Sequence, residues 1–486
     1  MTINTKLDRR AFLASASAAG AFTLGFRVPE AAAQGAAQAP EVNAWVVVKP
    51  DDTIIIRIAR SEMGQGTLTG LAQLTAEELE ADWSKVTTEY PTPGQNVARN
   101  RVWGDFSTGG SRGIRASHDY VRKGGAAARQ MLVQAAANGW GVPASECKAA
   151  KSVIIHAASG RTTTYGKVAE AASKLEVPKD VVLKDPKDWT IAGKPVKRLD
   201  TVDKLNGKQI YGMDLRLPGM LVAAIKDCPV FGGKVKSFDA SKIRDLKGVK
   251  HVLQVGTSGV SVVADTWWNA SSALEKLSIE WDFGPNAMVQ QKGIDAMLAA
   301  GLDAPEAFVG NAVGDAKDAL TKAARVVEAT YAYPFLNHAT MEPMNATALW
   351  TADKCEVWCP TQNGEAALAA TADASGLPIA KCDVYKIHLG GGFGRRGMTD
   401  YVRQAVAIAK QIPGTPVKLI WSREEDMTHG RYHPITQCKL RAGLDASGNI
   451  TAFHMRISGQ SILASDRKST RLNSSHLDLS RMPSSA

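Results

Sequence analysis

Cysteine is scarce in this 486-residue chain, and its spacing excludes one common use of the residue. The six cysteines contain no Cys-x-x-Cys pair and no run with the spacing that holds an iron–sulfur cluster. We therefore expect no iron–sulfur cluster in this chain, so electrons that leave through such a cluster need another subunit. Two of the cysteines, Cys355 and Cys359, fall in an expected strand, where buried or paired thiols are favoured over a metal site.

Long apolar runs and concentrated positive charge are also missing. No segment beyond the N-terminus is apolar enough to span a bilayer, so the protein is not expected to be membrane-spanning. The formal net charge of +10 is spread along the chain, which favours a solvated basic surface over a nucleic-acid site. About 450 residues remain after the N-terminal segment, enough for two or three globular domains.

The N-terminus has the pattern of an export signal. Arg9 and Arg10 precede a short run of small and apolar residues, and Ala31-Ala32-Ala33 offers a small-residue cleavage site. Residues 1–33 are therefore expected to be a twin-arginine signal peptide that directs the protein to the periplasm. Because that route carries folded proteins loaded with cofactor, and soluble NAD is not available outside the cytoplasm, the signal weakens an NAD-dependent interpretation.

The hydrophobic periodicity divides the rest of the chain into three regions of mixed strands and helices, which predicts an α+β protein. Residues 45–175 open with a strand pair and contain two glycine loops, each before a helix. Residues 325–464 alternate strands and helices around a longer glycine loop, with helices expected at 363–375 and from about Thr399. The middle region, 198–284, has strands expected at 209–213, 220–225, 251–255 and 260–264 and a helix at 267–277.

The longest glycine loop, Gly390 to Gly397, lies between an apolar strand-like run and an amphipathic helix. Its glycines let the backbone approach a ligand, and its amide groups near a helix N-terminus suit the anionic part of a large cofactor. Gly392, Gly394 and Gly397 also match the Gly-x-Gly-x-x-Gly dinucleotide pattern, with acidic residues at a suitable distance beyond. On this loop alone, a Rossmann-bound dinucleotide and a purely structural turn remain open.

Several motifs in order resemble the molybdenum-binding chain of the xanthine dehydrogenase and aldehyde oxidase family, over about residues 45–464. The detail is most similar to the beta (large) subunit of isoquinoline 1-oxidoreductase, because Glu62 to Gly66 stands ahead of the middle region. The resemblance implies a multi-domain molybdenum hydroxylase large-subunit fold in which residues 198–284 form an α/β hammerhead-type insert domain. The motifs are Gln209-Ile210-Tyr211-Gly212-Met213-Asp214, His338-Ala339-Thr340-Met341-Glu342-Pro343-Met344-Asn345, Pro360-Thr361-Gln362-Asn363, Gly390-Gly391-Gly392-Phe393-Gly394 and His429-Gly430-Arg431-Tyr432-His433-Pro434.

This resemblance implies a molybdenum held by molybdopterin, usually in its cytosine dinucleotide form in bacterial members. Gln362 would hydrogen-bond a ligand of the metal, and no side chain of this chain would ligate the metal directly. A helix N-terminal position with local hydrogen bonds is the structural alternative for Gln362. The implied cofactor-binding residues are Gly64, Gln65, Gly66, Thr108, Gly109, Gly110, Ser111, Gln362, Gly391, Gly392, Phe393 and Gly394.

The implied activity is hydroxylation of N-heterocycles or oxidation of aldehydes with water as the oxygen source. A small 2Fe–2S subunit and a cytochrome acceptor are the implied partners. Gly397 stands where purine-hydroxylating relatives have a substrate-binding glutamate, which disfavours purines. An exported dehydrogenase with a Rossmann-bound dinucleotide and a non-catalytic binding protein of the same fold are the alternatives.

The C-terminal residues depart from the pattern of the preceding strand. Residues 466–486 lack aromatic residues and periodicity, and Asp466 to His476 resemble the translation of a sequencing-adapter oligonucleotide. A disordered polar tail is the alternative. We expect residues 466–486 to be artefactual and the molybdopterin-binding domain at 325–464 to be incomplete. The family's general-base glutamate is expected beyond this truncation, so no catalytic residue is assigned and the 486-residue polypeptide is expected to be inactive.

Overall fold

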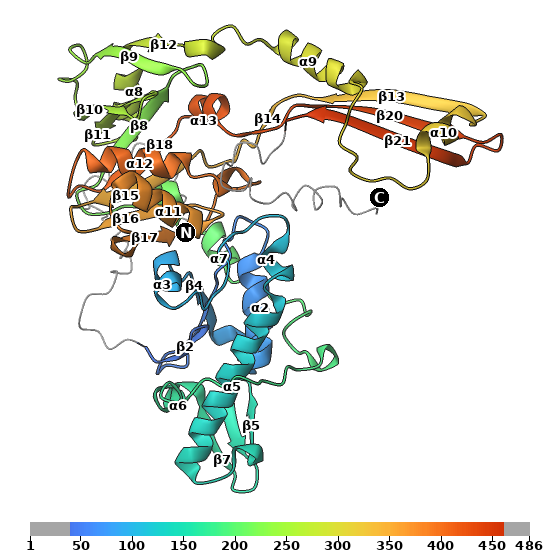
Figure 1. The fold of residues 1–486 in the computed structure, drawn as a ribbon. Helices are drawn as coiled ribbons and strands as arrows, with labels where there is room; N and C mark the ends of the chain where they lie inside the picture. The colour runs from blue at the N-terminus through green and yellow to red at the C-terminus, as the bar shows by residue number, and fades with distance from the viewer. Residues whose placement is uncertain (1–38, 461–486) are drawn as a thin grey trace, which may run out of the picture.

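The computed structural model describes residues 39–460; the expected signal peptide and C-terminal tail lie outside the described residues. The expected α+β class is confirmed, because the described residues form both helices and strands and most of the strand pairs are antiparallel. Figure 1 shows an N-terminal unit, a body built on a central sheet, and a long arm that extends from the body. Among the helices between residues 39 and 460, none combines the length and apolar character that a membrane crossing requires.

The N-terminal unit packs two helices against two small sheets. Helix α2 (Thr67–Leu79) lies along α5 (His118–Trp140), where a Cβ added at Gly125 would collide with the Thr75 carbonyl, so glycine permits the close approach. Shorter helices are α3 (Pro93–Ala98), α4 (Arg112–Arg115) and α6 (Tyr165–Ala172). The strands are β1 (Glu41–Asn43), β2 (Val46–Val48), β3 (Ile54–Arg57) and β4 (Val86–Glu89) in one sheet, and β5 (Cys147–Ala150), β6 (Val153–His156) and β7 (Arg161–Thr164) in the other.

The body is organised by one seven-stranded sheet in the order β10-β11-β8-β18-β15-β16-β17. Every residue of β11 and β18 is buried, as expected for strands covered on both faces. The helices are α8 (Trp267–Glu275), α11 (Gly364–Ser375), α12 (Asp400–Lys410) and α13 (Arg423–His429). The strands are β8 (Leu221–Asp227), β10 (Val249–Val255), β11 (Gly259–Ala264), β15 (Asn345–Trp350), β16 (Cys355–Cys359), β17 (Cys382–Lys386) and β18 (Val417–Ile420).

Parallel pairing of β8 with β18 joins the middle region to the C-terminal region in this sheet. The expected division at residues 198–284 stays a prediction, but three of its strands do not form a sheet of their own. The strand expected at 209–213 is wrong: Gly212–Asp214 forms a 3-10 turn. The Tyr211 N–H donates to the Asp214 carboxylate across 3.0 Å, and this local bond favours a turn over an extended strand.

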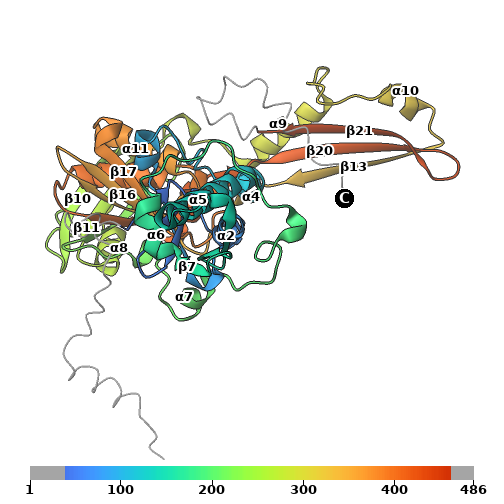
Figure 2. The same ribbon diagram turned by 90° about the horizontal axis from the view of Figure 1, so that it is seen from below.

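The arm is a three-stranded antiparallel sheet in the order β13-β20-β21, made of β13 (Arg325–Tyr333), β20 (Thr436–Leu444) and β21 (Ile450–Gly459). Helices α9 (Gln291–Asp303) and α10 (Ala316–Thr321) contact it, and Figures 1 and 2 both show the arm reaching away from the body. At its root, β14 (Leu336–Asn337) pairs with β19 (Tyr432–His433). A separate two-stranded antiparallel sheet, β9 (Lys234–Asp239) with β12 (Ser278–Asp282), lies near α8.

Candidate cofactor site

Gln362 connects two loops that were expected to bind one cofactor. Its side-chain nitrogen donates to the Thr108 carbonyl across 2.9 Å, and its side-chain oxygen accepts from the Gly394 N–H across 3.0 Å. The backbone adds a 2.7 Å bond from the Thr108 N–H to the Gln362 carbonyl. Gln362 is only 5% exposed, so this amide joins the N-terminal unit to the loop after β17 from inside the protein.

The hydroxyl groups of Ser61 and Thr108 hold the loop before α4 at the same junction. The Ser61 N–H donates to the Thr108 hydroxyl across 2.9 Å, and the Ser61 hydroxyl donates to the Thr361 carbonyl across 2.8 Å. All three residues are buried. The segment before α2, the loop before α4 and the turn before α11 therefore meet at one point, although they are far apart in the sequence.

The glycine loop itself follows a path that few residues other than glycine adopt. Gly391 has φ +93° and Gly394 has φ +99°, and Phe393 between them has φ +53° with its ring 67% exposed. A Cβ at Gly392 would lie 2.5 Å from the Met63 sulfur and 2.7 Å from the Gln362 side-chain oxygen. Close packing at Gly392, rather than left-handed geometry, therefore requires glycine there.

Glu342 supports this loop from the body. Its carboxylate accepts from the Gly390 N–H across 2.9 Å, from the Arg396 guanidinium across 3.0 Å, and from the Met213 N–H across 3.1 Å. Arg396 is completely buried, and one of its terminal nitrogens has no hydrogen-bond partner among the described residues. Glu342 lies in the family motif at residues 338–345, but the sequence assigned it no role, because the Gly390 N–H that it accepts from is 48 positions away.

Glu62 plays the same part for the loop before α2. It is 1% exposed and accepts from the N–H groups of Gly64, Gly66 and Leu68 across 2.8–3.0 Å. Arg198 contacts this carboxylate across 3.2 Å. Gln65, expected to contact the cofactor, hydrogen-bonds within its own loop through Ser61, Met63 and Thr67. The Glu62 carboxylate thus occupies the N-terminus of α2, where the helix dipole makes a negative charge favourable.

Free backbone donors flank Gln362 on both sides. The amides of Gly109, Gly110, Gly391, Gly392 and Phe393 donate to no acceptor among residues 39–460. A Cβ at Gly64 or Gly109 would meet nothing within 4 Å, so the space beside these loops is open. Converging amides with open space beside them suit a phosphate and the polar edge of a fused heterocycle. The residues present therefore fit a large anionic cofactor.

A cavity of about 780 Å³ opens beside Gly390 and Gly391. Glu62, Arg198 and Lys204 line it together with His388. Burial lowers the pKa of His388 to about 4, and its Nε2 has no partner among the described residues. The imidazole is therefore neutral at physiological pH.

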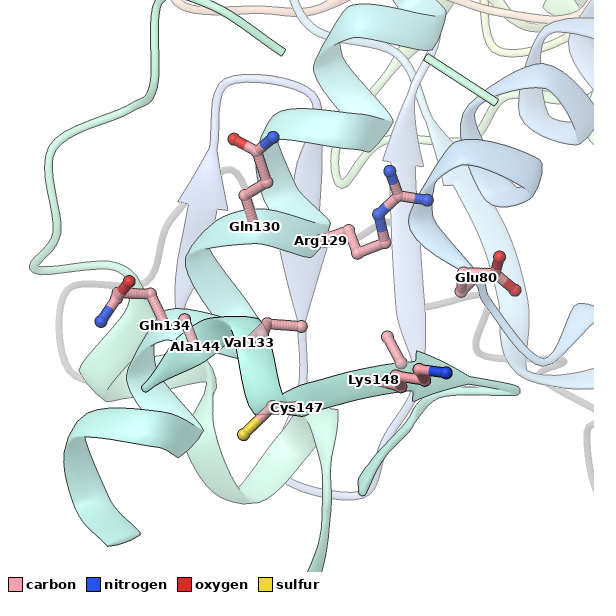
Figure 3. Close-up of a pocket in the computed structure, with 9 residues that line it drawn as sticks. Glu80, Arg129, Gln130, Val133, Gln134, Ala144, Cys147 and Lys148 are labelled. Atoms are coloured by element: carbon pink, nitrogen blue, oxygen red, sulfur yellow. The ribbon is translucent and has the colours of Figure 1, made fainter. Parts of the chain in front are cut away.

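A second cavity, of about 490 Å³, lies elsewhere in the fold. Figure 3 shows Arg129, Gln130 and Gln134 from α5 beside Cys147 and Lys148 of β5. None of the residues expected to bind the cofactor lines it. It is therefore distinct from the site at Gln362.

Lys386, at the end of β17, is a buried cation beside the site. Its ammonium donates to the Ala59 carbonyl and lies 4.6 Å from the ring centres of Tyr90 and Phe106. Burial, and to a smaller extent the charge of Arg60, lowers the pKa of Lys386 to about 7. The sequence offered no signal for this residue, because the packing of β17 against α3 of the N-terminal unit is not visible in local periodicity.

The strand order disfavours a Rossmann arrangement around the glycine loop. In a dinucleotide-binding βαβ unit, the strands before and after the helix are neighbours. Here β17 and β18 are separated by β15 and β16. Helix α12 also begins at Asp400, several residues beyond Gly394.

Comparisons with known proteins give consistent results. Residues 303–477 match one family described as a molybdopterin cofactor-binding domain, and residues 13–203 match a second family of the same description. A membrane-bound aldehyde dehydrogenase of Gluconacetobacter polyoxogenes, whose name includes pyrroloquinoline quinone, is 31% identical over 92% of this chain and 60% of its own length. Isoquinoline 1-oxidoreductase subunit beta of Brevundimonas diminuta is 29% identical over 94% of this chain and 65% of its own length.

The chain thus spans less than two thirds of the length of these two relatives. Among solved structures, quinoline 2-oxidoreductase from Pseudomonas putida 86 matches with a TM-score of 0.44 and 21% identity, over 55% of this chain and 39% of that chain.

Proposed function

Because the chain belongs to the molybdenum-binding subunits of the xanthine dehydrogenase and aldehyde oxidase family, we propose that it holds the molybdenum cofactor of an oxidoreductase. The proposed reaction is the hydroxylation of an N-heterocycle or the oxidation of an aldehyde, with water as the oxygen source. One observation carries the proposal: two glycine loops with unused amides meet at the buried amide of Gln362.

The two glycine loops would contact different parts of the cofactor. The amides of Gly109 and Gly110, just before α4, would receive the phosphate part of molybdopterin, and those of Gly391 to Phe393 would lie along the pterin and the metal. One of the two side-chain N–H groups of Gln362 donates to the Thr108 carbonyl, so the second would be available for a ligand of the metal. When bound, the molybdenum supplies the oxidising centre. This chain's residues supply orientation, through Glu342 beneath the loop and Glu62 at α2.

Three finer features belong to the proposal: the form of the cofactor, the electron partners and the route of export. We propose the cytosine dinucleotide form of the cofactor, because the resemblance to bacterial members of the family implies it; the pyrophosphate of such a form suits loops at helix N-termini. A small 2Fe–2S subunit is proposed as the electron partner because the sequence has no cluster-spaced cysteines, with a cytochrome as the onward acceptor. Export by the twin-arginine route to the periplasm rests on Arg9 and Arg10 and on the small-residue run behind them.

The substrate class follows from two separate observations. Gly397 replaces the glutamate of purine-hydroxylating relatives, and a Cβ there would meet nothing within 4 Å. The names of the two relatives point to an aldehyde and to isoquinoline. We therefore propose a small aldehyde or a non-purine N-heterocycle.

Metal and cofactor analysis tests the proposal on the full gene product, purified from a host that makes molybdopterin. We expect about one molybdenum and one pterin dinucleotide per chain. Stoichiometric NAD or pyrroloquinoline quinone without molybdenum would refute it. Turnover of benzaldehyde or isoquinoline with an artificial electron acceptor then separates an enzyme from a non-catalytic binding protein. Iron–sulfur absorbance from this polypeptide purified alone would contradict the proposed partner.

A further inference from the structure

One face of the arm is apolar and uncovered by residues 39–460. Side chains alternate between the two faces of a sheet, and directly paired residues share a face. Val327 pairs with Ala442, which pairs with Phe453, so these three lie on one face of the arm. The exposed apolar residues of this face are Val327 (43%), Tyr331 (53%), Tyr333 (59%), Phe453 (56%), Met455 (53%) and Ile457 (58%).

The opposite face already has its own covering layer. Arg456 on that face donates to the carbonyl of Glu306 across 3.1 Å and also to the carbonyl of Ala304, just after α9. A Cβ at Gly443 would meet Leu320 of α10 and Ala323. The arm is thus a two-layer structure, and the apolar residues on its other face belong to none of the three buried clusters of the described chain.

Charge is sorted between the two faces. Glu328, Lys439 and Arg441 lie on the helix-covered face together with Arg456, because their registers pair them with one another. On the apolar face, only Arg325 at the end of β13 is charged. A face without charge in its centre is typical of a surface that becomes buried, since interface centres are depleted of charged residues.

The area of the apolar face indicates what kind of polypeptide covers it. Three strands of nine or ten residues make a face of roughly 30 by 14 Å, on the order of 400 Å². That is as large as the largest apolar patches of ordinary monomers, but only half of the roughly 800 Å² per partner in a stable free-standing interface. The area therefore favours a cover held by additional contacts or by chain continuity over a second copy docked through this face alone.

The relatives carry polypeptide that could form such a cover. The chain spans 60% and 65% of their lengths, which leaves 40% and 35% unmatched. We propose that the apolar face of β13, β20 and β21 seats polypeptide equivalent to this unmatched part of the relatives. The inference goes beyond the proposed function and does not depend on the substrate.

The root of the arm places such a cover beside the cofactor site. His338, directly after β14, stacks on His433 with ring centres 4.4 Å apart. Its Nε2 lies 3.7 Å from the position of a Cβ at Gly394. Polypeptide seated at the root of the arm would therefore lie next to the glycine loop.

Co-expression tests the proposal. The 486-residue chain is produced with a separate polypeptide that carries the unmatched 35% of isoquinoline 1-oxidoreductase subunit beta. The variants are Phe453→Glu on the face and Phe308→Glu as the matched control, since Phe308 is 80% exposed and lies outside the three strands. We expect the two polypeptides to copurify at about one to one, with at least a tenfold loss for Phe453→Glu and none for Phe308→Glu.

Three results would overturn the proposal: no copurification with the unaltered chain, equal loss in both variants, or a dimer of the chain alone that Phe453→Glu dissociates in analytical ultracentrifugation. Circular dichroism checks the fold of each variant, and Met455→Lys serves as a second probe of the face. Molybdenum content is measured separately. Copurification of the two polypeptides without molybdenum would support the proposed contact with the arm and would count against the proposed function.

Discussion

The backbone N–H of Gly394 donates to the side-chain oxygen of Gln362 across 3.0 Å, and the side-chain nitrogen of Gln362 donates to the Thr108 carbonyl. Thr108 lies 254 positions from Gln362 in the sequence. A single buried side chain therefore fixes the spacing between two loops that each carry amides without an acceptor among residues 39–460. Removing either contact should change this spacing without greatly changing the hydrophobic core.

Replacing Gln362 by alanine should lower the cofactor content of the purified protein by at least tenfold. The substitution removes both contacts of the side chain and leaves the buried Thr108 carbonyl without a partner, which costs about 1–3 kcal/mol. The Gly394 N–H, on an exposed residue, also loses its acceptor. Molybdenum analysis of the purified variant is the measurement. Gln411→Ala is the control, because Gln411 is exposed at the end of α12. Unchanged molybdenum content in Gln362→Ala would show that the loops hold their spacing without this amide.

Gly392→Leu should abolish cofactor retention. A side chain there would start 2.5 Å from the Met63 sulfur and 2.7 Å from the Gln362 oxygen, so it must displace one of them or enter the cofactor space. Gly397→Ala is the control in the same loop, since its Cβ would meet nothing within 4 Å. The pterin released on denaturation, measured by fluorescence, reports retention. Equal pterin content in the two variants would refute the packing argument.

The sequence singles out Gln362 and the glycine loop because both lie in short motifs whose order is informative, and their contact with a cofactor stays a prediction. Helices α11 and α12 were also predicted closely, since each has a strong local period and a clear end. Glu62 and Glu342 acquire their roles only when distant N–H groups converge on them. Such convergence depends on tertiary contacts, which local patterns do not encode.

The pairing of β8 with β18 shows the same limit at the level of the sheet. The strand β8 was expected from its apolar run, yet nothing local indicates that its neighbour is β18, almost 200 residues away. The arm illustrates a second limit. The alternation of Phe453, Met455 and Ile457 predicts one apolar face, but not that this face is exposed in the described chain.

Glu342→Gln should destabilise the fold by about 3–5 kcal/mol, because Arg396 would lose its buried carboxylate partner. The new amide would also point a donor at one of the N–H groups that the carboxylate now accepts. Denaturant unfolding measures the change. Glu170→Gln removes an exposed pair with Lys174 and should cost less than about 1 kcal/mol. Similar losses in the two variants would mean that the buried pair contributes no more than the surface pair.

Lys386→Met should change how stability depends on pH. Burial lowers the pKa of Lys386 from 10.5 to about 7, so between these values the unfolded chain binds a proton that the folded chain does not. The free energy of unfolding should therefore rise with pH in this window, by up to about 1.4 kcal/mol per pH unit from this group. The penalty for the buried charge is present in full below pH 7 and disappears above the unfolded value.

The Lys386→Met variant lacks the pH-dependent contribution of this lysine to the free energy of unfolding. It should exceed the unaltered protein in stability most clearly below pH 7, and the advantage should shrink as the pH approaches 10. Urea unfolding at a series of pH values from 6 to 10 gives the comparison, with Lys174→Met as the control because Lys174 is exposed. Parallel pH curves for Lys386→Met and the unaltered protein would show that burial does not lower the pKa of Lys386.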